Sequence, residues 1–153
     1  MTASFGVSLQ QQIGNTPLLR IERATGGLRD VQMLAKAEWT NPGGSVKDRA
    51  ASNIVAEAFH GIEGTKHMGT SIIAKIYDAS IADAKLGIET EAAYTMARRV
   101  AREEGLLIGV SAAAALVGAV QIAKDAADGS VVVTIFPDSG DKYLSEHFWD
   151  ENP

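Results

Sequence analysis

The chain has 153 residues, of which 46% are hydrophobic and 22% are charged. These proportions are typical of one globular domain with a single core. The net charge of −5 argues against nucleic acid and anionic membranes as partners, and it leaves small, neutral or anionic ligands open. The sequence has no cysteine, which excludes disulfides, zinc–thiolate sites and a thiol nucleophile.

The sequence predicts a cytoplasmic protein without a membrane partner. Residues Met1–Leu9 lack a basic start followed by an apolar run, so they do not resemble a signal peptide. No window contains the length of apolar residues that a membrane-spanning helix requires. The absence of cysteine also fits a reducing compartment.

Two strands and a helix are predicted in the first third of the chain. Thr16–Ile21 is a short apolar run whose proline suits the start of a strand. In Val31–Trp39, apolar and polar residues alternate, as in a strand that is covered on one side. Ser45 is a suitable N-cap for a helix over Val46–Ala58.

The remainder predicts an α/β fold with a mostly parallel sheet and flanking helices. A strand–helix–strand unit near the C-terminus carries this prediction, because its β-branched second strand is typical of a buried parallel strand. In chain order we expect a loop over Phe59–Ser80, a helix between Thr90 and Gly105, a strand over Leu106–Val110, a helix over Ser111–Ala126, a strand over Val131–Phe136 and a short helix over Lys142–Trp149.

Lys47 follows a glycine-rich loop and is expected in the first turn of a helix. The partial positive charge of a helix N-terminus favours the neutral amine, or an imine made from it, over an ammonium. Such an amine suits carbonyl chemistry. Backbone N–H groups of Gly43, Gly44 and Ser45 are available in this reading to an anionic ligand. The alternative is a solvated Lys-Asp-Arg face on a helix that begins after a turn; the spacing does not match a nucleotide P-loop.

His60, Glu63 and His67 have the spacing of metal ligands on one helical face. Gly61 and Gly64 lie between them and weaken the helix that this spacing requires. We therefore expect no metal site.

A hydrolytic triad is a further alternative near the C-terminus. The sequence has no nucleophile elbow, so we do not expect this chemistry. The residues considered are Asp138, Ser139, Asp141 and His147.

Two motifs in order carry a resemblance to a known family. Ile13–Leu18 reads Ile-Gly-Asn-Thr-Pro-Leu, and Asn41–Arg49 reads Asn-Pro-Gly-Gly-Ser-Val-Lys-Asp-Arg. Together they resemble the opening of the pyridoxal-phosphate-dependent cysteine synthases and their cystathionine β-synthase relatives. The resemblance implies a shortened form of the tryptophan synthase β-like fold. It continues through Gly61–Met68, Glu103–Ser111 and Phe136–Ser145.

The resemblance implies that Lys47 holds pyridoxal phosphate as a Schiff base and that the Ser111 hydroxyl meets the pyridine nitrogen. From the sequence alone, Ser111 could equally be the N-cap of its alanine-rich helix. The implied reaction is β-replacement on an O-activated serine with sulfide. A small amino acid is then the substrate, and a homo-oligomer is expected.

Two loops that the family places between these blocks are missing from the sequence. They are the Ser-Gly-Asn-Thr-Gly type loop, which binds the substrate carboxylate, and the Gly-Thr-Gly-Gly-Thr type loop, which holds the cofactor phosphate. We place a junction between Ala58 and Phe59, so that a block over residues 1–58 and a block over residues 59–153 form one compact domain. Impaired activity is expected. The alternative function is a non-catalytic remnant or deletion form that acts only through protein contacts, with exposed sheet edges that favour association.

Overall fold

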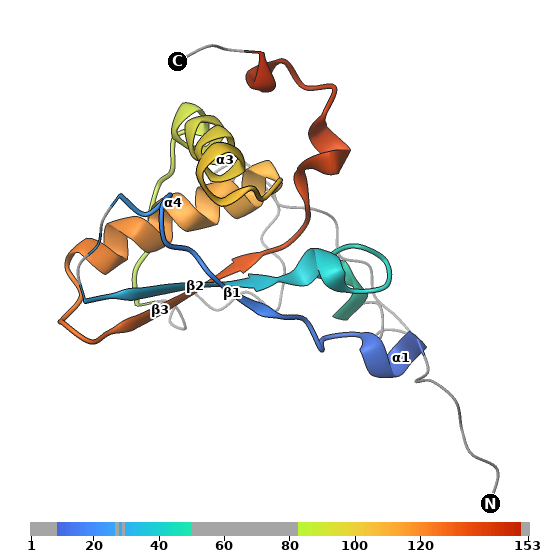
Figure 1. The fold of residues 1–153 in the computed structure, drawn as a ribbon, viewed down its shortest axis with the longest axis horizontal. Helices are drawn as coiled ribbons and strands as arrows, with labels where there is room; N and C mark the ends of the chain where they lie inside the picture. The colour runs from blue at the N-terminus through green and yellow to red at the C-terminus, as the bar shows by residue number, and fades with distance from the viewer. Residues whose placement is uncertain (1–8, 27, 29, 50–82, 151–153) are drawn as a thin grey trace, which may run out of the picture.

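The computed structural model describes residues 9–26, 28, 30–49 and 83–150, and it has the expected α/β architecture (Figure 1). The predicted loop over Phe59–Ser80 and the junction at Ala58 lie outside the described residues. Of the predicted helix over Val46–Ala58, residues 46–49 are described: Val46 lies in a turn, and residues 47–49 are helical. The elements are α1 (Leu9–Gln12), β1 (Leu18–Arg20), β2 (Gln32–Ala37), η1 (Glu38–Thr40), α3 (Thr90–Glu104), α4 (Val110–Lys124), β3 (Val131–Phe136), η2 (Gly140–Tyr143) and η3 (His147–Trp149).

The sheet has the order β1-β2-β3 and joins both ends of the chain. Strand β1 pairs antiparallel with β2, with Leu18 opposite Lys36. Strand β2 pairs parallel with β3, with Gln32 opposite Val131. One of the two described pairings is therefore parallel.

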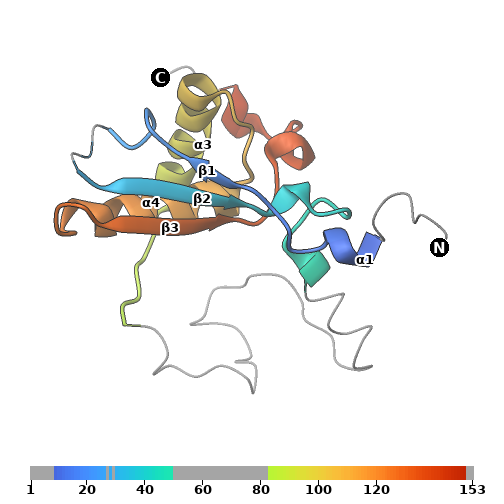
Figure 2. The same ribbon diagram turned by 60° about the horizontal axis from the view of Figure 1, so that its bottom comes forward.

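Helix α4 packs on one face of the sheet, and α3 packs on α4 (Figures 1 and 2). The alternation predicted for β2 is confirmed, because its odd-numbered residues are buried under α4. Small residues along α4 allow its backbone to approach the strands closely. Each large side chain buried in this layer contributes about 1.5–3 kcal/mol to the free energy of folding. The core between the layers includes Met33, Ala35, Val100, Ile108, Ala112, Ala113, Leu116 and Phe136.

The segment between the two long helices differs from the prediction. Leu106–Val110 is not a strand: only Ile108 forms a bridge, with Ser139. Helix α3 ends at Gly105, which has the left-handed conformation expected of a C-cap (φ 70°), and α4 begins at Val110. Between these helices only Ile108 pairs with another segment, and the described part of the connection from β2 to β3 contains both α3 and α4.

The predicted helix caps are corrected at two positions. The N-cap of α3 is Glu89, so Thr90 is already the first helical residue. The N-cap of α4 is Gly109, and Ser111 is the second residue of the helix. The interpretation of Ser111 as an N-cap is therefore wrong.

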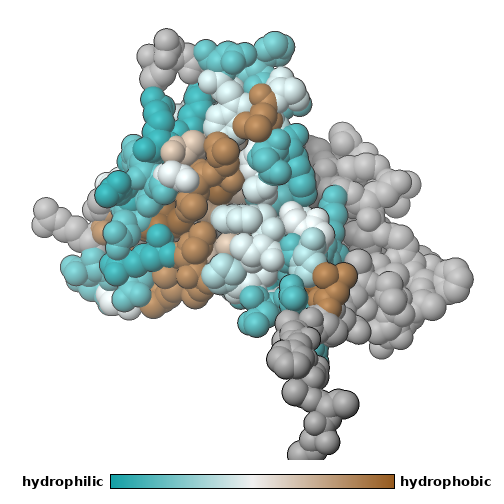
Figure 3. All heavy atoms as spheres, turned by 45° about the vertical axis from the view of Figure 1, so that its right-hand side comes forward, coloured by the Kyte–Doolittle hydropathy of each residue, from teal (hydrophilic) through white to brown (hydrophobic). Residues whose placement is uncertain are grey.

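Strand β3 was expected to be buried, and the structure buries only one of its faces. Thr134 and Phe136 are buried, whereas Val131, Val133 and Ile135 are 52–58% exposed. The physical reason is that α3 and α4 both lie on the same side of the sheet (Figure 2). On the side of the molecule that Figure 3 displays, apolar residues form a band between hydrophilic areas.

The C-terminal segment forms two short 3₁₀ helices, η2 and η3, instead of the one helix expected over Lys142–Trp149. Aromatic contacts fix this path. The Phe148 ring stacks on Tyr94 at a centroid distance of 4.5 Å, and the Trp149 indole N–H donates to the Tyr143 carbonyl at 2.8 Å. These contacts attach the segment to α3.

The end of α3 is tied to the segment that follows β1. One carboxylate oxygen of Glu104 accepts the backbone N–H groups of Glu22, at 3.0 Å, Arg23, and Ala24, at 2.9 Å. The Arg99 guanidinium also donates to the Arg23 carbonyl at 3.2 Å. Residues about 80 positions apart in the sequence are thus held together. Within the described ranges, no helix is long and apolar enough to cross a membrane.

Candidate functional site

Three segments meet at the carboxyl ends of β2 and β3, where open α/β sheets bind ligands. The loop after η1 forms a bridge from Ser45 to Asp138, and the Val46 N–H donates to the Pro137 carbonyl at 2.8 Å. The N-cap of α4 contacts the loop after β3, because the Gly109 N–H donates to the Asp138 carbonyl at 3.2 Å. The loop after β3 thus lies between the lysine motif and the start of α4.

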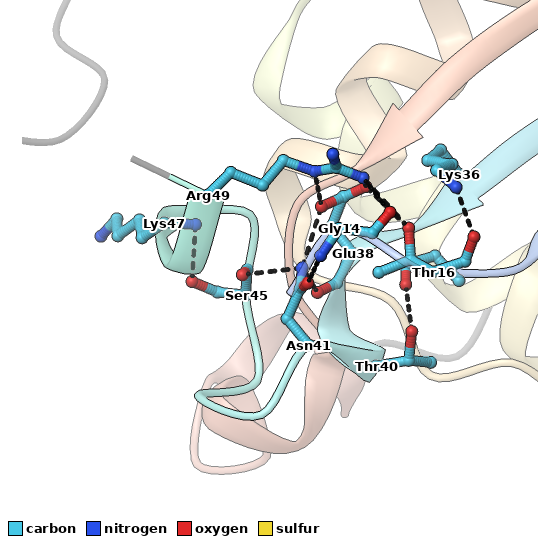
Figure 4. Close-up of polar contacts among 10 residues, drawn as sticks. Gly14, Thr16, Lys36, Glu38, Thr40, Asn41, Ser45, Lys47 and Arg49 are labelled. Atoms are coloured by element: carbon cyan, nitrogen blue, oxygen red, sulfur yellow. Dashed lines mark hydrogen bonds and ion pairs between the residues drawn. The ribbon is translucent and has the colours of Figure 1, made fainter. Parts of the chain in front are cut away.

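Lys47 lies in a helical turn that Ser45 caps, as expected. The Lys47 backbone N–H donates to the Ser45 hydroxyl at 3.1 Å. The Lys47 side chain is exposed and points away from the neighbouring polar cluster (Figure 4). In the described part of the chain, its amine has no hydrogen-bond or ion-pair partner.

A buried carboxylate lies behind this turn. The Glu38 side chain is 2% exposed and accepts two hydrogen bonds from the Arg49 guanidinium, at 2.7 Å from Nε and 2.8 Å from Nη2. Asn41 Nδ2 and Thr16 Oγ1 each donate to it at 2.9 Å. We call these four residues the Glu38 network (Figure 4).

The Glu38 network stabilises the ionised form of Glu38. Hydrogen bonds from Arg49 are the largest cause, and they lower the pKa of Glu38 from 4.5 to about 2, although burial alone raises it. The same bonds raise the pKa of Arg49. The pair therefore stays charged at neutral pH.

The network also explains why the two N-terminal motifs occur together. The Gly14 N–H donates to Asn41 Oδ1 at 2.7 Å, and Arg49 Nη2 donates to the Gly14 carbonyl at 2.9 Å. Gly14 has φ 83°, and a Cβ there would lie 2.8 Å from an Arg49 nitrogen, so only glycine fits. Sequence reasoning did not identify Glu38 or Thr16 as parts of a site. Thr16 lies inside the first motif and Glu38 lies three residues before the second, and neither position carries a signal of its own.

Two of the three N–H groups expected to meet an anion in the glycine loop are used within the chain. The Gly43 N–H donates to the Asp48 carboxylate, and the Gly44 N–H donates to the Asn41 carbonyl at 2.8 Å. Gly44 has φ 75°, which suits a tight turn. Because these two donors are already used within the chain, they are not available to a ligand.

Ser111 lies at the opposite side of the C-terminal loop. It is exposed on the first turn of α4 and borders a shallow hollow of about 520 Å³. Lys47 does not line this hollow. Ser45 and Gly109 both contact Asp138. Lys47 lies two residues after Ser45, and Ser111 lies two residues after Gly109. The hollow is lined by Ile88, Thr90, Ala93, Val110, Ser111, Ala114 and Tyr143.

Asp138 has one satisfied and one unsatisfied oxygen. The Tyr143 hydroxyl donates to Oδ2 at 3.0 Å, while Oδ1 is buried without a hydrogen-bond partner. Burial first, and then this hydrogen bond, raise the pKa of Tyr143. A Cβ at Gly109 would collide with Oδ1 and would lie 3.1 Å from the Tyr143 ring. The start of α4 therefore requires glycine at this contact.

The structure does not assemble the hydrolytic alternative. The Ser139 hydroxyl donates to Asp141, whereas the fully exposed His147 ring lies 3.4 Å from Asp150. The serine and the histidine thus have separate acidic neighbours.

Among the described residues, no group of three or more His, Asp or Glu side chains could hold a metal ion. His60, Glu63 and His67 lie outside the described residues.

The described residues fit part of the cofactor that the sequence resemblance implies. Lys47 presents an amine without a partner, and Ser111 presents a hydroxyl on the first turn of α4, across Asp138. Neither side chain needs to break a described contact to reach a ligand. The sequence offers no Gly-Thr-Gly-Gly-Thr loop for the phosphate group. The described residues thus offer an amine and a hydroxyl, the sequence offers no group for the phosphate, and the roles of Lys47 and Ser111 toward a cofactor stay a prediction.

Comparison with known proteins agrees with the sequence resemblance. The family model described as pyridoxal-phosphate dependent enzyme matches residues 9–74, a range that runs through the predicted junction. A cysteine synthase of Aquifex aeolicus is 43% identical over 93 residues, which are 59% of this chain and 28% of that protein. A cysteine synthase of Staphylococcus aureus is 34% identical over 122 residues, which are 79% of this chain and 39% of that protein. The chain thus spans between 28% and 39% of the length of these relatives.

Solved structures share the fold at low sequence identity. The Entamoeba histolytica cysteine synthase aligns with a TM-score of 0.79 and 15% identity, over 99% of this chain and 93% of that chain. The O-acetylserine dependent cystathionine β-synthase of Helicobacter pylori aligns with a TM-score of 0.66 and 16% identity, over 95% and 99%. The expected fold is therefore confirmed. The chain is thus similar to pyridoxal-phosphate-dependent enzymes, and in particular to cysteine synthases.

Proposed function

We propose that this chain is a cysteine-synthase-like protein that binds pyridoxal phosphate through the amine of Lys47. One observation carries the proposal: Lys47 is exposed, its amine has no partner among the described residues, and its turn is anchored to the buried Glu38 network through Ser45 and Arg49. An unengaged amine on a rigid turn is the arrangement that imine formation requires.

The reaction class proposed for this site is β-replacement on an O-activated serine with sulfide. When bound, pyridoxal phosphate withdraws electrons from the α-carbon of an amino acid and so assists loss of the β-substituent. Lys47 Nζ supplies the amine and, once released, accepts the α-proton. Ser111 Oγ offers a neutral hydrogen-bond partner for the ring nitrogen. A small amino-acid substrate, a cytoplasmic location and a homo-oligomeric state belong to the same proposal.

The loops missing from the sequence limit the expected activity. Without the substrate loop, no known group orients an amino acid, and misplacement by about 1 Å costs on the order of 100-fold in rate. Without the phosphate loop, the imine carries most of the binding. We therefore expect cofactor binding to be easier to detect than turnover.

A second candidate function is a non-catalytic protein that acts through protein contacts. The observation that favours it is the apolar face of the sheet, where Leu18, Val131, Val133 and Ile135 are each about half exposed. Exposed apolar patches of this kind are typical of surfaces that bind other proteins.

Absorption spectroscopy with added pyridoxal phosphate, followed by borohydride reduction and peptide mass analysis, tests the proposal. We expect a visible imine band and a reduced adduct on Lys47, both lost in Lys47→Ala. Lys124→Ala, which removes an exposed lysine at the end of α4, is the matched control and should retain both signals. Equal adducts in all three proteins, or none, would exclude the cofactor site and favour the non-catalytic function.

A further inference from the structure

We propose that Glu38 is a positioning residue for Lys47, because its buried carboxylate fixes both ends of the lysine turn. The inference rests on the proposed function, since it concerns the residue that is proposed to carry the cofactor. It adds to that function a residue that does not itself touch cofactor or substrate.

The direction of the Lys47 side chain depends on the backbone that carries it. Its amine has no described partner, so no contact of its own side chain holds it in place. The turn from Ser45 to Arg49 therefore determines where the amine can reach.

The first end of the turn is held through Asn41. Asn41 Nδ2 donates to the Ser45 carbonyl at 3.1 Å and to Glu38 Oε2 at 2.9 Å. The same nitrogen lies 2.7 Å from the Glu38 carbonyl, so its two hydrogens are shared among these three acceptors. Glu38 thus orients the amide that holds Ser45, two residues before Lys47.

The second end of the turn is held through Arg49. Its guanidinium contacts both oxygens of Glu38 in a bidentate geometry, at 2.7 Å and 2.8 Å. Bidentate pairs of arginine and carboxylate restrict orientation as well as distance. Arg49 lies two residues after Lys47, so the same carboxylate fixes the turn on both sides (Figure 4).

The chemistry of Glu38 makes this hold sensitive to a single substitution. Both carboxylate oxygens of Glu38 accept hydrogen bonds, four in total. In Glu38→Gln, the amide N–H₂ group would replace one of these oxygens and would face a donor that it cannot accept from. The contacts from Val46 to Pro137 and from Lys142 to Gly44 do not involve Glu38. Glu38→Gln should therefore loosen the Asn41 and Arg49 anchors and leave the outer contacts in place.

Hydrogen exchange of the full chain, without added cofactor, provides the first test. We expect the amides of residues 41–49 to exchange about tenfold faster or more in Glu38→Gln, as loss of a buried charged hydrogen bond implies. Glu103→Gln is the matched control, because it removes an exposed carboxylate that pairs with Arg99 at 3.0 Å. Exchange at 41–49 that stays within twofold of this control would overturn the proposal, even if the melting temperature falls.

Trapping of Lys47 by borohydride provides the second test. Adduct formation should be about tenfold slower in Glu38→Gln and intermediate in Arg49→Lys, which keeps the charge and loses the bidentate contact. Equal rates in all proteins would contradict positioning. If Glu38→Gln does not fold, Arg49→Lys takes its place in both experiments. If the native chain forms no adduct, the proposed function fails, while faster exchange in the variant still supports the hold of Glu38 on the turn.

Discussion

Both faces of strand β3 are largely apolar, but the two faces of the sheet have opposite surroundings. On one face, Met33, Ala35 and Phe136 lie under α4 and are almost inaccessible. On the other, Val133 and Ile135 are more than half exposed, and Leu34 of β2 lies beside Val133. Strand β3 reads Val-Val-Val-Thr-Ile-Phe, a run without the polar alternation of a strand that has one wet face.

The comparison shows that the composition of a strand and its burial can differ. Composition indicates the environment that a strand is suited to, whereas burial depends on which other elements cover it. The apolar run of β3 is suited to cover on both sides. The described helices cover one side only. The covered face therefore supplies much of the stability of the fold, and we expect the exposed face to favour association.

Among the variants proposed here, Phe136→Ala should lower the free energy of unfolding the most, because it removes a side chain from the covered face of the sheet. The ring is fully buried and lies 6.1 Å from the Trp39 ring between centroids. Its loss should lower the free energy of unfolding by about 3–5 kcal/mol. Urea denaturation measures this change, with Val133→Ala as the control from the exposed face. Similar losses in both variants would show that the two faces do not differ.

Gly109→Ala should have the next largest effect, at the edge where the sheet meets α4. A Cβ would collide with the Asp138 carboxylate, which Tyr143 holds on its other side. We expect a loss of about 1–3 kcal/mol, as in other overpacked sites. Gly87→Ala is the control, because a Cβ there meets nothing within 4 Å. Equal stability of the two variants in thermal unfolding would contradict the close contact.

Acid should destabilise the Glu38 network and leave the packing on both faces of the sheet unchanged. Glu38 has a pKa of about 2 in the folded chain and 4.5 as its ordinary value, so its contribution is complete above pH 4.5 and is lost as the pH falls toward 2. Because Arg49 is 41% exposed, solvent screening reduces this contribution to about 1–2 kcal/mol. The melting temperature should fall over this range in the native chain and less in Glu38→Gln. Parallel acid profiles would be inconsistent with a lowered pKa.

Val133→Thr should have the smallest effect on stability and a visible effect on association. The side chain is 58% exposed, so the free energy of unfolding should change by about 0.5 kcal/mol or less. Self-association measured by sedimentation should decrease, because the hydroxyl interrupts the apolar face. A native chain that sediments as a monomer would remove the basis for this expectation.

Much of the fold follows from periodicity. The alternation in β2, the stop of α3 at Gly105 and the β-branched run of β3 were each predicted from local pattern and confirmed. The bridge at Ile108 was not, because a short apolar run reads the same whether it forms a ladder or one pair. The exposed face of β3 depends on distant elements, which local pattern does not contain.

The site was predictable only in part. The lysine and its capping serine have a local signal, because the glycines, Ser45 and Lys47 are adjacent in the sequence. The Glu38 network has no such signal. Thr16 comes from the first motif, Asn41 and Arg49 come from the second, and Glu38 follows β2, so these residues meet only in the folded chain. The roles of Lys47 and Ser111 toward a cofactor, and the division into blocks at Ala58, stay predictions.

The contacts of Glu104 and the parallel pairing of β2 with β3 have a consequence for the continuity of the backbone. They join residues before position 50 directly to residues after position 83, and no residue between these positions takes part in them. Two separate polypeptides, one ending after Arg49 and one beginning at Asp83, therefore contain between them every described partner of these contacts. A cut of the backbone between positions 50 and 83 would therefore leave both partners of each of these contacts in the mixture of the two pieces.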